Sequence, residues 1–539
     1  MEQRQNNQRK EVGAVRSMFR VGMVSHVSMR LCWLIPAILA GAFTFLTACT
    51  VGPNYVRPTA EVPGVYKEMG GWKVAQPGDH LTRGAWWEIF NDPQLNALEE
   101  QVNISNQSLK LAEAQFRQAR ALVQVARAAY FPTVTVGASF TRSRISPNAP
   151  SVAGATGTTG TSSPPYSDYL LGADVSWEVD LWGRVRRNVE SSKATAQATA
   201  ADLESTRLLV QAELAQDFFQ LHTFDAQKEL LDAAVIAFQK FLELTKNQYA
   251  SGVASRADVL SAETQLKTTQ AQAIDVGVQR AQLEHAIALL VGKPASLFSI
   301  PVRPLTTVPP AVPVGVPSEI LERRPDIAGA ERRVAAANAQ IGVVVAAYYP
   351  TVTLSASGGF ESTSLSKWLM WPSRFWSIGP GISETVYDGG LRRGQTAAAR
   401  AAYDGTVASY RQTVLTGFQE VEDNLAALRI LEEEAKVQDE AVKSAQQSVD
   451  FTTNQYKAGT VSYLNVLVAQ TIALNNEITA LGIASRRMTA SVLLVKALGG
   501  GWNVSSLRSI DDPGTKGNKY QRSTESKSPP ADQPRVDVP

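Results

Sequence analysis

Three carboxylate side chains stand close enough in the sequence to suggest acid–base chemistry. Asp174, Glu178 and Asp180 lie in a run, Tyr169 to Asp180, that alternates polar with apolar residues. Residues two apart in a β-strand share one face, so this spacing places all three carboxylates on the wet face of one strand. Water on that face solvates the three carboxylates, so their presence does not imply a catalytic reaction. We therefore expect no catalytic role for these residues.

The other residue types that carry chemistry are scattered along the chain. The histidines show no metal-ligand spacing and no partner cysteine, so we expect solvated or half-buried side chains for His26, His80, His222 and His285. Methionines beyond residue 48 form no thioether series for soft metals, and they are Met69, Met370 and Met488. We expect neither a metal site nor an enzyme.

Phosphate and nucleic-acid chemistry find no support either. Gly292-Lys293 superficially resembles a phosphate loop. However, Ile287 occupies the upstream position where that motif requires glycine, and Pro294 occupies the position where it requires serine or threonine. The net charge of +2 gives no reason to expect a polyanionic partner. The sequence predicts no nucleotide, no nucleic-acid partner and no cofactor.

The position of Cys49 predicts how the N-terminal part of the chain is processed. Arg30 precedes the apolar stretch Leu31 to Leu46, and small residues lead to Cys49, which is the pattern of a secretory signal and resembles a lipobox. In that resemblance residues 1–48 are removed, with Met29 as an alternative start, and Cys49 carries a diacylglycerol and a third acyl chain. Thr50, in place of an aspartate, indicates the outer membrane. An ordinary signal peptide is the alternative.

The chain contains an internal duplication. Ala128 to Val134 recurs as Ala346 to Val352, and Asn247 to Gly252 recurs as Asn454 to Gly459, in the same order. Each copy is predicted to contain a helix, a strand pair, a very long helix, a tight turn and a shorter helix. The segments 186–249 and 392–456 lack proline, and a helix of ~65 residues is ~100 Å long.

The long helices carry the apolar spacing of coiled-coil packing. Residues three and four apart form a seam on each helix, consisting of Val210, Leu214, Phe218 and Leu221, and of Val414, Phe418, Val421, Leu425 and Leu428. These helices are expected to pack laterally against other helices.

The predicted strands have the features of membrane-spanning strands. Val134, Val136, Ala138 and Phe140 alternate with polar residues, and the same alternation appears in 169–180, 351–360 and 376–382. A half-buried soluble sheet would show it too. Aromatic residues near the strand ends favour the membrane, and they are Tyr169, Trp177, Trp182, Trp368, Trp371 and Trp376.

Four strands cannot close a membrane barrel, because each open edge leaves backbone groups unsatisfied in hydrocarbon. Two copies would supply eight strands and three would supply twelve. Only the wider ring leaves an open lumen, so a channel favours a homotrimer. Asp174, Glu178 and Asp180 would then line a water-filled lumen and give it a weak cation preference.

Several motifs carry a resemblance to a known family. They are Val51 to Tyr55, Trp86-Trp87 with Asp92-Pro93, Trp177 to Arg184, Arg323 to Ile327, Asp388-Gly389-Gly390, and Gly499 to Trp502. Together they resemble the outer-membrane efflux protein family, in its lipoprotein branch similar to OprM, CusC and NodT. The resemblance implies a TolC-like fold, an α+β membrane protein in which a homotrimer forms a twelve-stranded outer-membrane barrel and a periplasmic α-barrel of long coiled-coil helices.

The resemblance also implies partners and an activity. A passive exit duct for drugs or other small toxic compounds would work with a periplasmic adaptor and a resistance-nodulation-division pump of the inner membrane. An exit duct for type I polypeptide secretion is the alternative, since it shares the fold. A self-sufficient porin would need more strands per chain, and a coiled-coil lipoprotein would not need strands.

A periplasmic gate is implied at the tip of the second hairpin. Its residues would be Tyr456, Lys457, Leu464 and Val468. The family's acidic positions are occupied here by Val461 and Val468, and a basic position by Thr471. A gate closed by salt bridges is therefore not expected, and we predict a hydrophobic constriction that dewets. The alternative is that Val468 fills the hairpin seam.

The domain organisation follows from these observations. Residues 1–48 form the signal, 49–105 a lipidated segment with an equatorial region, 106–300 the first repeat, 301–317 a Pro-rich linker and 318–502 the second repeat. The polar tail 503–539 is expected to be disordered.

Overall fold

A computed structural model of the chain describes residues 50–68, 85–144, 164–305, 309–310 and 320–502. The predictions for the signal, Cys49, His26, His80, Met69 and the tail 503–539 lie outside the described residues. The described residues fall into two compact units. The first contains the strands with residues 122–192 and 336–403 and the N-terminal segment up to Val56, and the second contains the remaining helical segments.

The two repeats contain matching elements, and their helices are equal in length. The first consists of α3 (Gln107–Ala128), β1 (Thr133–Ser143), β2 (Tyr166–Val179), α4 (Arg184–Ala250) and α5 (Arg256–Leu290). The second consists of α7 (Pro325–Ala346), β3 (Thr351–Ser362), β4 (Arg374–Ser383), α8 (Leu391–Lys457) and α9 (Tyr463–Ala497). The paired helices have 22, 67 and 35 residues in both repeats, which confirms the predicted order of elements.

Shorter elements lie before, between and within the repeats. They are η1 (Trp86–Phe90), α2 (Pro93–Ser105), η2 (Ala295–Leu297), α6 (Ile320–Arg323), η4 (Leu365–Lys367) and η5 (Trp371–Ser373). Asp92 caps the N-terminus of α2, since its carboxylate accepts hydrogen bonds from the backbone N–H groups of Gln94 and Leu95.

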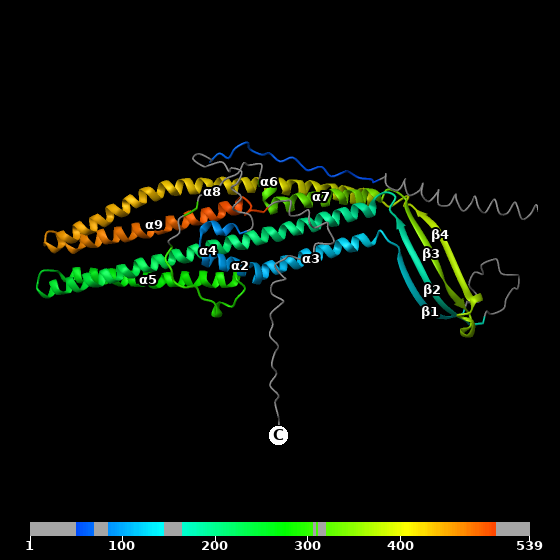
Figure 1. Cartoon of the computed structure of the whole chain (residues 1–539), viewed down its shortest axis with the longest axis horizontal. Coiled ribbons are helices and arrows are strands. Elements are labelled where there is room, and N and C mark those ends of the chain that lie inside the picture. Colours follow the sequence, from blue (N-terminus) through cyan, green and yellow to red (C-terminus); the bar gives the residue numbers. More distant parts are fainter. Residues whose placement is uncertain (1–49, 69–84, 145–163, 306–308, 311–319, 503–539) are drawn as a thin grey trace, which may run out of the picture. The chain divides into compact units, whose positions relative to one another are not determined.

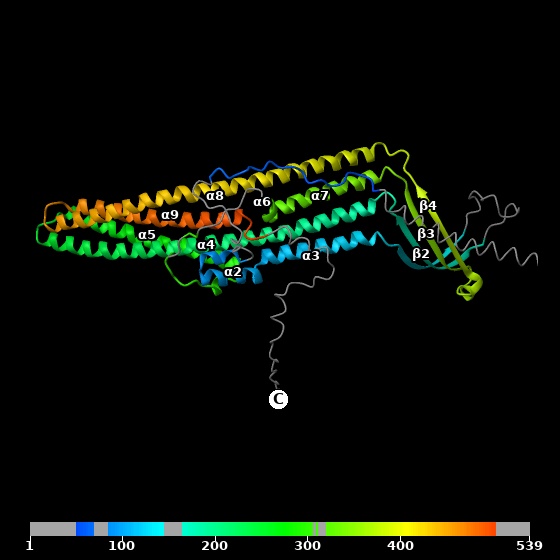
Figure 2. The same ribbon diagram turned by 45° about the horizontal axis from the view of Figure 1, so that its top comes forward.

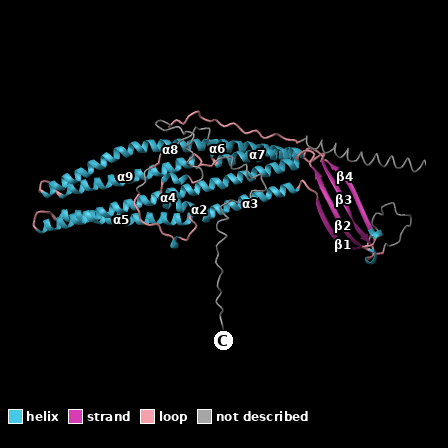
Figure 3. Cartoon of the chain, in the orientation of Figure 1, coloured by secondary structure: helices cyan, strands magenta, loops and turns pink. Residues whose placement is uncertain are grey.

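The four strands form one antiparallel sheet in the order β1-β2-β3-β4 (Figure 3). Its register is continuous, with Val134 opposite Val175, Val175 opposite Ala356, and Ala356 opposite Ile378. Among the described residues, strands β1 and β4 each pair on one side only, so both edges of the sheet are open there.

The helical unit contains two long hairpins that lie side by side, α4 with α5 and α8 with α9 (Figures 1 and 2). All the predicted seam residues of α4 and α8 are buried, which confirms the coiled-coil spacing. Near the hairpin tips, side chains of all four helices form one apolar cluster that includes Phe238, Leu266, Tyr456 and Val466. The second repeat therefore packs against the first along its helices.

Among the described helices, α9 alone has the length and composition of a membrane span. Its polar side chains nevertheless contact α8, where Gln438 Nε2 donates to Asn476 Oδ1 at 2.9 Å and Arg486 pairs with Glu434 at 2.7 Å. Such contacts are typical of a helix that belongs to a bundle.

Candidate functional site

The two faces of the sheet differ in chemistry. One face carries apolar side chains from every strand, and those on the edge strands are highly exposed, with Val136 at 74% and Trp376 at 77%. The other face carries Thr135, Asp174 and Ser357 in one cross-strand row. Exposed apolar area of this kind on a regular sheet is typical of strands that face lipid.

The structure places two of the three carboxylates that were predicted to line the lumen on the polar face of the sheet. Asp174 stands opposite Thr135 and Ser357, and Glu178 stands opposite Thr353. Glu178 is paired with Arg184, whose Nε donates to Oε1 at 2.8 Å, so one of the two acids is neutralised at the end of the strand.

The prediction that Asp180 belongs to this strand face is wrong. Strand β2 ends at Val179, and the Asp180 carboxylate accepts hydrogen bonds from the backbone N–H groups of Val185 (3.0 Å) and Arg186 (2.9 Å). These N–H groups belong to the first turn of α4 and have no acceptor within the helix. A carboxylate at this place also faces the positive end of the helix dipole. The physical role of Asp180 is to start α4.

The second repeat repeats this arrangement. Asp388 accepts from the backbone N–H of Gly390 (2.9 Å) and from Arg392 Nε (2.6 Å) at the start of α8. Hydrogen bonds from Arg392 and then from Gly390 lower the pKa of Asp388. An aspartate followed by glycine and arginine at the end of each strand pair was the signal in the sequence for these helix starts.

The N-terminal segment that follows Cys49 lies against the strand–helix junction. The Val51 N–H donates to the Trp182 carbonyl at 3.0 Å, and Asn338 Nδ2 donates to the Pro53 carbonyl at 3.0 Å. Arg187 is buried there, and its Nη2 donates to Asn54 Oδ1 at 2.8 Å. Cys49 itself lies outside the described residues, but it is one peptide bond from the docked Thr50.

Aromatic residues collect at both ends of the strands, which confirms that prediction. At the junction with the helices, the Trp182 ring stacks on Tyr349 with centroids 4.8 Å apart, and its Nε1 donates to the Pro350 carbonyl at 2.7 Å. At the opposite ends, Tyr169 contacts Phe140 (4.8 Å) and Trp368 (5.9 Å). Amphipathic rings at two levels are the pattern of the two boundaries of a bilayer.

The predicted gate residues divide into two groups at the hairpin tips. Tyr456 is buried, and its hydroxyl donates to Gln248 Oε1 of the first hairpin, so it joins the two hairpins within one chain. Lys457 is exposed at the end of α8. Val461 packs partly buried against the tip cluster.

Leu464 and Val468 belong to an exposed apolar stripe on α9. Leu464, Val468 and Ile472 are 59%, 49% and 50% exposed, and their spacing of four residues places them on one helix face. Val468 therefore does not fill the seam of its own hairpin. Ile472 extends the stripe by one turn, and the regular spacing was the signal in the sequence that could have identified it.

A buried polar network near residue 300 was not predicted. The Asp225 carboxylate accepts hydrogen bonds from the backbone N–H of Arg303 (3.0 Å) and from Arg280 Nε (2.7 Å), and it lies 3.2 Å from His222 Nδ1. Burial opposes its ionisation, but the hydrogen bonds from His222, Arg303 and Arg280 outweigh burial and lower the pKa of Asp225. The expectation of a solvated or half-buried histidine is wrong for His222, which is buried against Phe218.

A second buried acid lacks any such partner. Glu99 of α2 is fully buried, and neither carboxylate oxygen has a hydrogen-bond partner among the described residues. Desolvation by burial raises the pKa of Glu99 well above its ordinary value, because burial disfavours the charged form of the carboxyl group.

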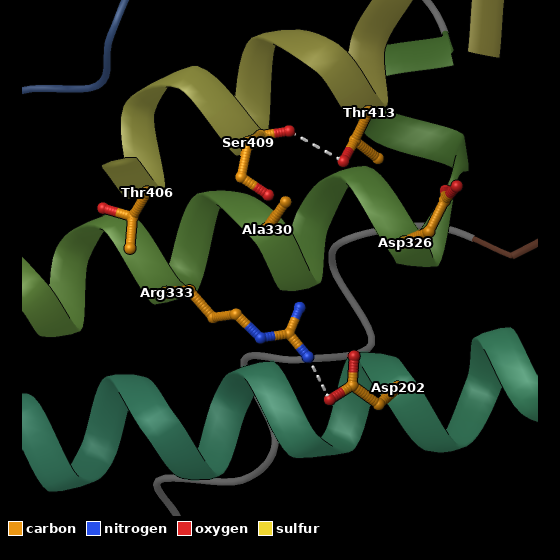
Figure 4. Close-up of a pocket in the computed structure, with 7 residues that line it drawn as sticks. All are labelled: Asp202, Asp326, Ala330, Arg333, Thr406, Ser409 and Thr413. Carbon is orange, nitrogen blue, oxygen red and sulfur yellow. Dashed lines mark hydrogen bonds and ion pairs between the residues drawn. The ribbon is translucent and has the colours of Figure 1, made fainter. Parts of the chain in front are cut away.

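A small cavity of about 180 Å³ lies where α4, α7 and α8 meet (Figure 4). Its acidic lining residues are already paired, Asp202 with Arg333 and Asp326 with Arg324. Arg324 is buried and also reaches Glu420 of α8 at 2.6 Å, and although burial opposes its charge, these carboxylates raise its pKa. The cavity thus marks a helix junction and not a ligand site, and the described residues contain no cluster of metal ligands.

Comparison with known proteins places this arrangement in a family. The model of the outer membrane efflux protein family matches residues 98–293 and 316–500. The antibiotic efflux pump outer membrane protein ArpC of Pseudomonas putida is 30% identical over 468 residues, which cover 86% of this chain and 95% of that protein. The outer membrane protein OprJ of Pseudomonas aeruginosa is 29% identical over 465 residues, covering 85% and 94%.

Solved structures agree with the fold. The outer-membrane channel OprN superposes with a TM-score of 0.77 at 30% identity, covering 84% of this chain and all of that one (100%). The outer membrane protein VceC of Vibrio cholerae superposes with a TM-score of 0.70 at 28% identity, covering 79% and 99%. From the family match over both repeats, the relatives and the shared fold, the chain belongs to the outer membrane efflux protein family, and it is an outer-membrane channel protein with a TolC-like α/β fold.

Proposed function

We propose that three copies of this chain form one duct, in which each copy contributes its four strands to a shared twelve-stranded barrel in the outer membrane. The observation that carries the proposal is the sheet with two chemically distinct faces and two open edges. Unpaired edges in hydrocarbon cost several kcal/mol for each backbone group, so β1 of one copy must pair with β4 of the next. Three copies leave an open lumen, whereas two would leave a barrel filled by side chains.

The polarity of the sheet assigns its faces in this barrel. The apolar face with Val136 and Trp376 faces lipid, and the face with Asp174 and Glu178 lines the lumen. The acids give the lumen a weak preference for cations, reduced at Glu178 by its pairing with Arg184.

We also propose that Cys49 is acylated and anchors each copy in the leaflet that faces the periplasm. Thr50 and Val51 contact the strand–helix junction, at the level of Trp182 and Tyr349. Acyl chains on the preceding residue would enter the bilayer at this aromatic boundary, and several chains hold more firmly than one.

The duct would be the passive final section of a tripartite system. An adaptor protein in the periplasm and a resistance-nodulation-division pump in the inner membrane would select the cargo and supply the energy. The relatives are named as efflux pump proteins for antibiotics and for solvents, which favours small toxic compounds as cargo over the polypeptides of type I secretion.

The assembly can be tested by crosslinking edge strands. Val136→Cys on β1 and Ile378→Cys on β4, in one chain, should give covalent dimers and trimers with a flexible thiol-reactive crosslinker, because these strands meet only between copies. Val175→Cys with Ala356→Cys is the matched control, since these residues already face each other within one chain and should give monomers. Native mass of the detergent-purified protein should be that of a trimer, and a stable monomer or dimer would end the proposal.

The role in efflux needs a test in cells. In a strain without its own outer-membrane efflux channel, the chain should restore dye extrusion only when a matching adaptor and inner-membrane pump are also expressed. Restoration of polypeptide secretion with an ABC exporter, without dye extrusion, would show that the secretion alternative is right.

A further inference from the structure

Charged side chains in the sheet are sorted completely by face. The polar face carries every carboxylate of the four strands, which are Asp168, Asp174, Glu178 and Glu361. The apolar face carries both arginines of the strands, Arg142 and Arg374. Arg142 follows Phe140 by two residues on that face, and Arg374 stands opposite Phe360. The two basic groups therefore point away from the lumen.

Both arginines lie toward the strand ends farthest from the docked N-terminal segment. Arg142 pairs with Ser167 near the start of β2, whereas Val51 bonds to Trp182 beyond the end of β2. The aromatic cluster of Phe140, Tyr169 and Trp368 stands at the same end. In the proposed barrel this end belongs to the outer leaflet of the membrane.

The surroundings of the arginines leave their charges available. Both side chains are exposed, and among the described residues neither is within ion-pair distance of a carboxylate. The Arg374 guanidinium lies over the Trp371 ring, 3.4 Å from its centroid, and this cation–π contact orients it. A planar guanidinium binds phosphate oxygens through two parallel hydrogen bonds.

An arginine on a lipid-facing strand is tolerated only near the boundary of the bilayer, where it meets the headgroups. Basic residues at this level attract anionic lipid headgroups. Because the carboxylates of the strands lie on the other face, the charged strand residues on the lipid-facing side of this boundary are all positive. We propose that Arg142 and Arg374 bind the phosphate groups of phosphorylated lipids in the outer leaflet.

The proposal rests on the trimeric barrel, and it places the lipid sites at the contacts between neighbouring copies. Because Arg142 lies on β1 and Arg374 on β4, each edge-to-edge contact between copies brings one arginine of each type to the same boundary. A trimer therefore has three such sites, each built from two chains.

Native mass spectrometry of the delipidated trimer, titrated with a lipid A that carries two phosphates, tests this directly. Up to three tightly bound lipids per trimer are expected. Arg142→Gln with Arg374→Gln should weaken binding about 10-fold or more, from the loss of two basic groups per site. Arg142→Lys with Arg374→Lys should retain part of the binding, since charge remains while the two-pronged geometry is lost.

Matched controls separate this site from general charge effects. Lys240→Gln with Lys267→Gln removes the same charge from exposed helical positions and should leave binding unchanged. The same lipid without phosphates should bind the wild type as weakly as lipid A binds the glutamine variant, and inorganic phosphate alone should not bind. Equal binding of both lipids, or undiminished binding to a trimeric glutamine variant, would overturn the lipid site, whereas failure to observe trimers would overturn the barrel itself.

Discussion

Thr50 packs directly on the α-carbon of Gly183, so that a β-carbon at residue 183 would overlap the Thr50 methyl group and lie 3.2 Å from its Cα. Gly183 also has a positive φ of 82°, a backbone conformation that favours glycine. Thr50, the residue that follows Cys49, therefore occupies space that only a glycine at position 183 leaves free. Arg187 secures the same segment through Asn54 and packs on Gly342, where a β-carbon would lie 2.8 Å from its Cγ.

Gly183→Ala should release the N-terminal segment from the junction. The Val51 N–H, now bonded to the Trp182 carbonyl, should exchange with deuterium faster by about one order of magnitude, because the new methyl group occupies the place of Thr50. Gly390→Ala is the control, since Gly390 holds the same place before α8 with φ 93° and has no atom within 4 Å of a built β-carbon. Both variants are strained by about 1 kcal/mol, but only the first should change exchange at Val51. Equal exchange in both would show that the Thr50 contact does not hold the segment.

Tyr456→Phe should loosen the two hairpin tips from each other. It removes the hydroxyl that donates to Gln248 across the hairpins, a hydrogen bond with a net value of about 1 kcal/mol. Hydrogen exchange of residues 454–463 and the closed-state lifetime in single-channel recordings should report the loss.

Tyr463→Phe is the matched control for this change. Tyr463 is buried beside Tyr456 with ring centroids 5.9 Å apart, but its hydroxyl has no hydrogen-bond partner among the described residues. Burial, and then Tyr456 and Asp258, raise the pKa of Tyr463 to about 12, so it stays neutral. Removing its hydroxyl should leave tip exchange unchanged or slower, and faster exchange in this variant would contradict the assignment.

Much of this fold could be predicted because its elements are long and repeat themselves. Helices of 67 residues without proline and strands with period-two alternation leave few alternatives, and duplication supplies each pattern twice. Asp180 was misplaced because the alternation of β2 continues by chance into the first residue after the strand. Only the hydrogen bonds to Val185 and Arg186 reveal a helix start there.

The buried polar groups could not be predicted for a different reason. Arg303 bonds to Asp92 over 211 positions of sequence, and Asp225 meets Arg280 and Arg303 only after three segments pack together. Single-sequence patterns report neighbours along one element, whereas these pairs depend on tertiary structure. Glu99 lies four residues after Leu95 and three before Val102, so helical spacing places it on the buried face and separates it from the exposed Glu100, but it does not show that the carboxylate lacks a partner.

Glu99→Gln should raise the thermal-unfolding midpoint at neutral and alkaline pH. The pKa of Glu99 is raised in the folded chain, so wild-type stability is full below the ordinary pKa of about 4.5 and falls as pH rises from there toward the folded value. The free energy of unfolding falls by at most about 1.4 kcal/mol per pH unit in this range. The variant lacks this loss, so the two midpoints should coincide near pH 4 and separate by about 2 °C or more near pH 8. Glu100→Gln should follow the wild type at every pH, and parallel wild-type and Glu99→Gln profiles would contradict a neutral buried acid.

The last prediction concerns closure by the stripe of Leu464, Val468 and Ile472, which is exposed on each chain. If three such stripes meet around the axis of the trimer, closure depends on apolar contact and dewetting, and it should be insensitive to salt. Val468→Asp would place three carboxylates in the constriction near Lys457. Water would then enter, and conductance should become dependent on ionic strength and on pH around the carboxylate range.

Asn465→Asp provides the control for the gate. Asn465 is also exposed on α9, but it is already polar and stands about 60° around the helix from Val468, so the added charge lies beside the stripe and not within it. Single-channel recordings of the three forms across salt and acid titrations should show new sensitivity only for Val468→Asp. Strong pH-dependent opening of the wild type would mean that acids such as Glu263 hold the gate. Asp258 is less suited to that role, because its carboxylate accepts from the Ser255 backbone N–H at 2.9 Å and so starts α5.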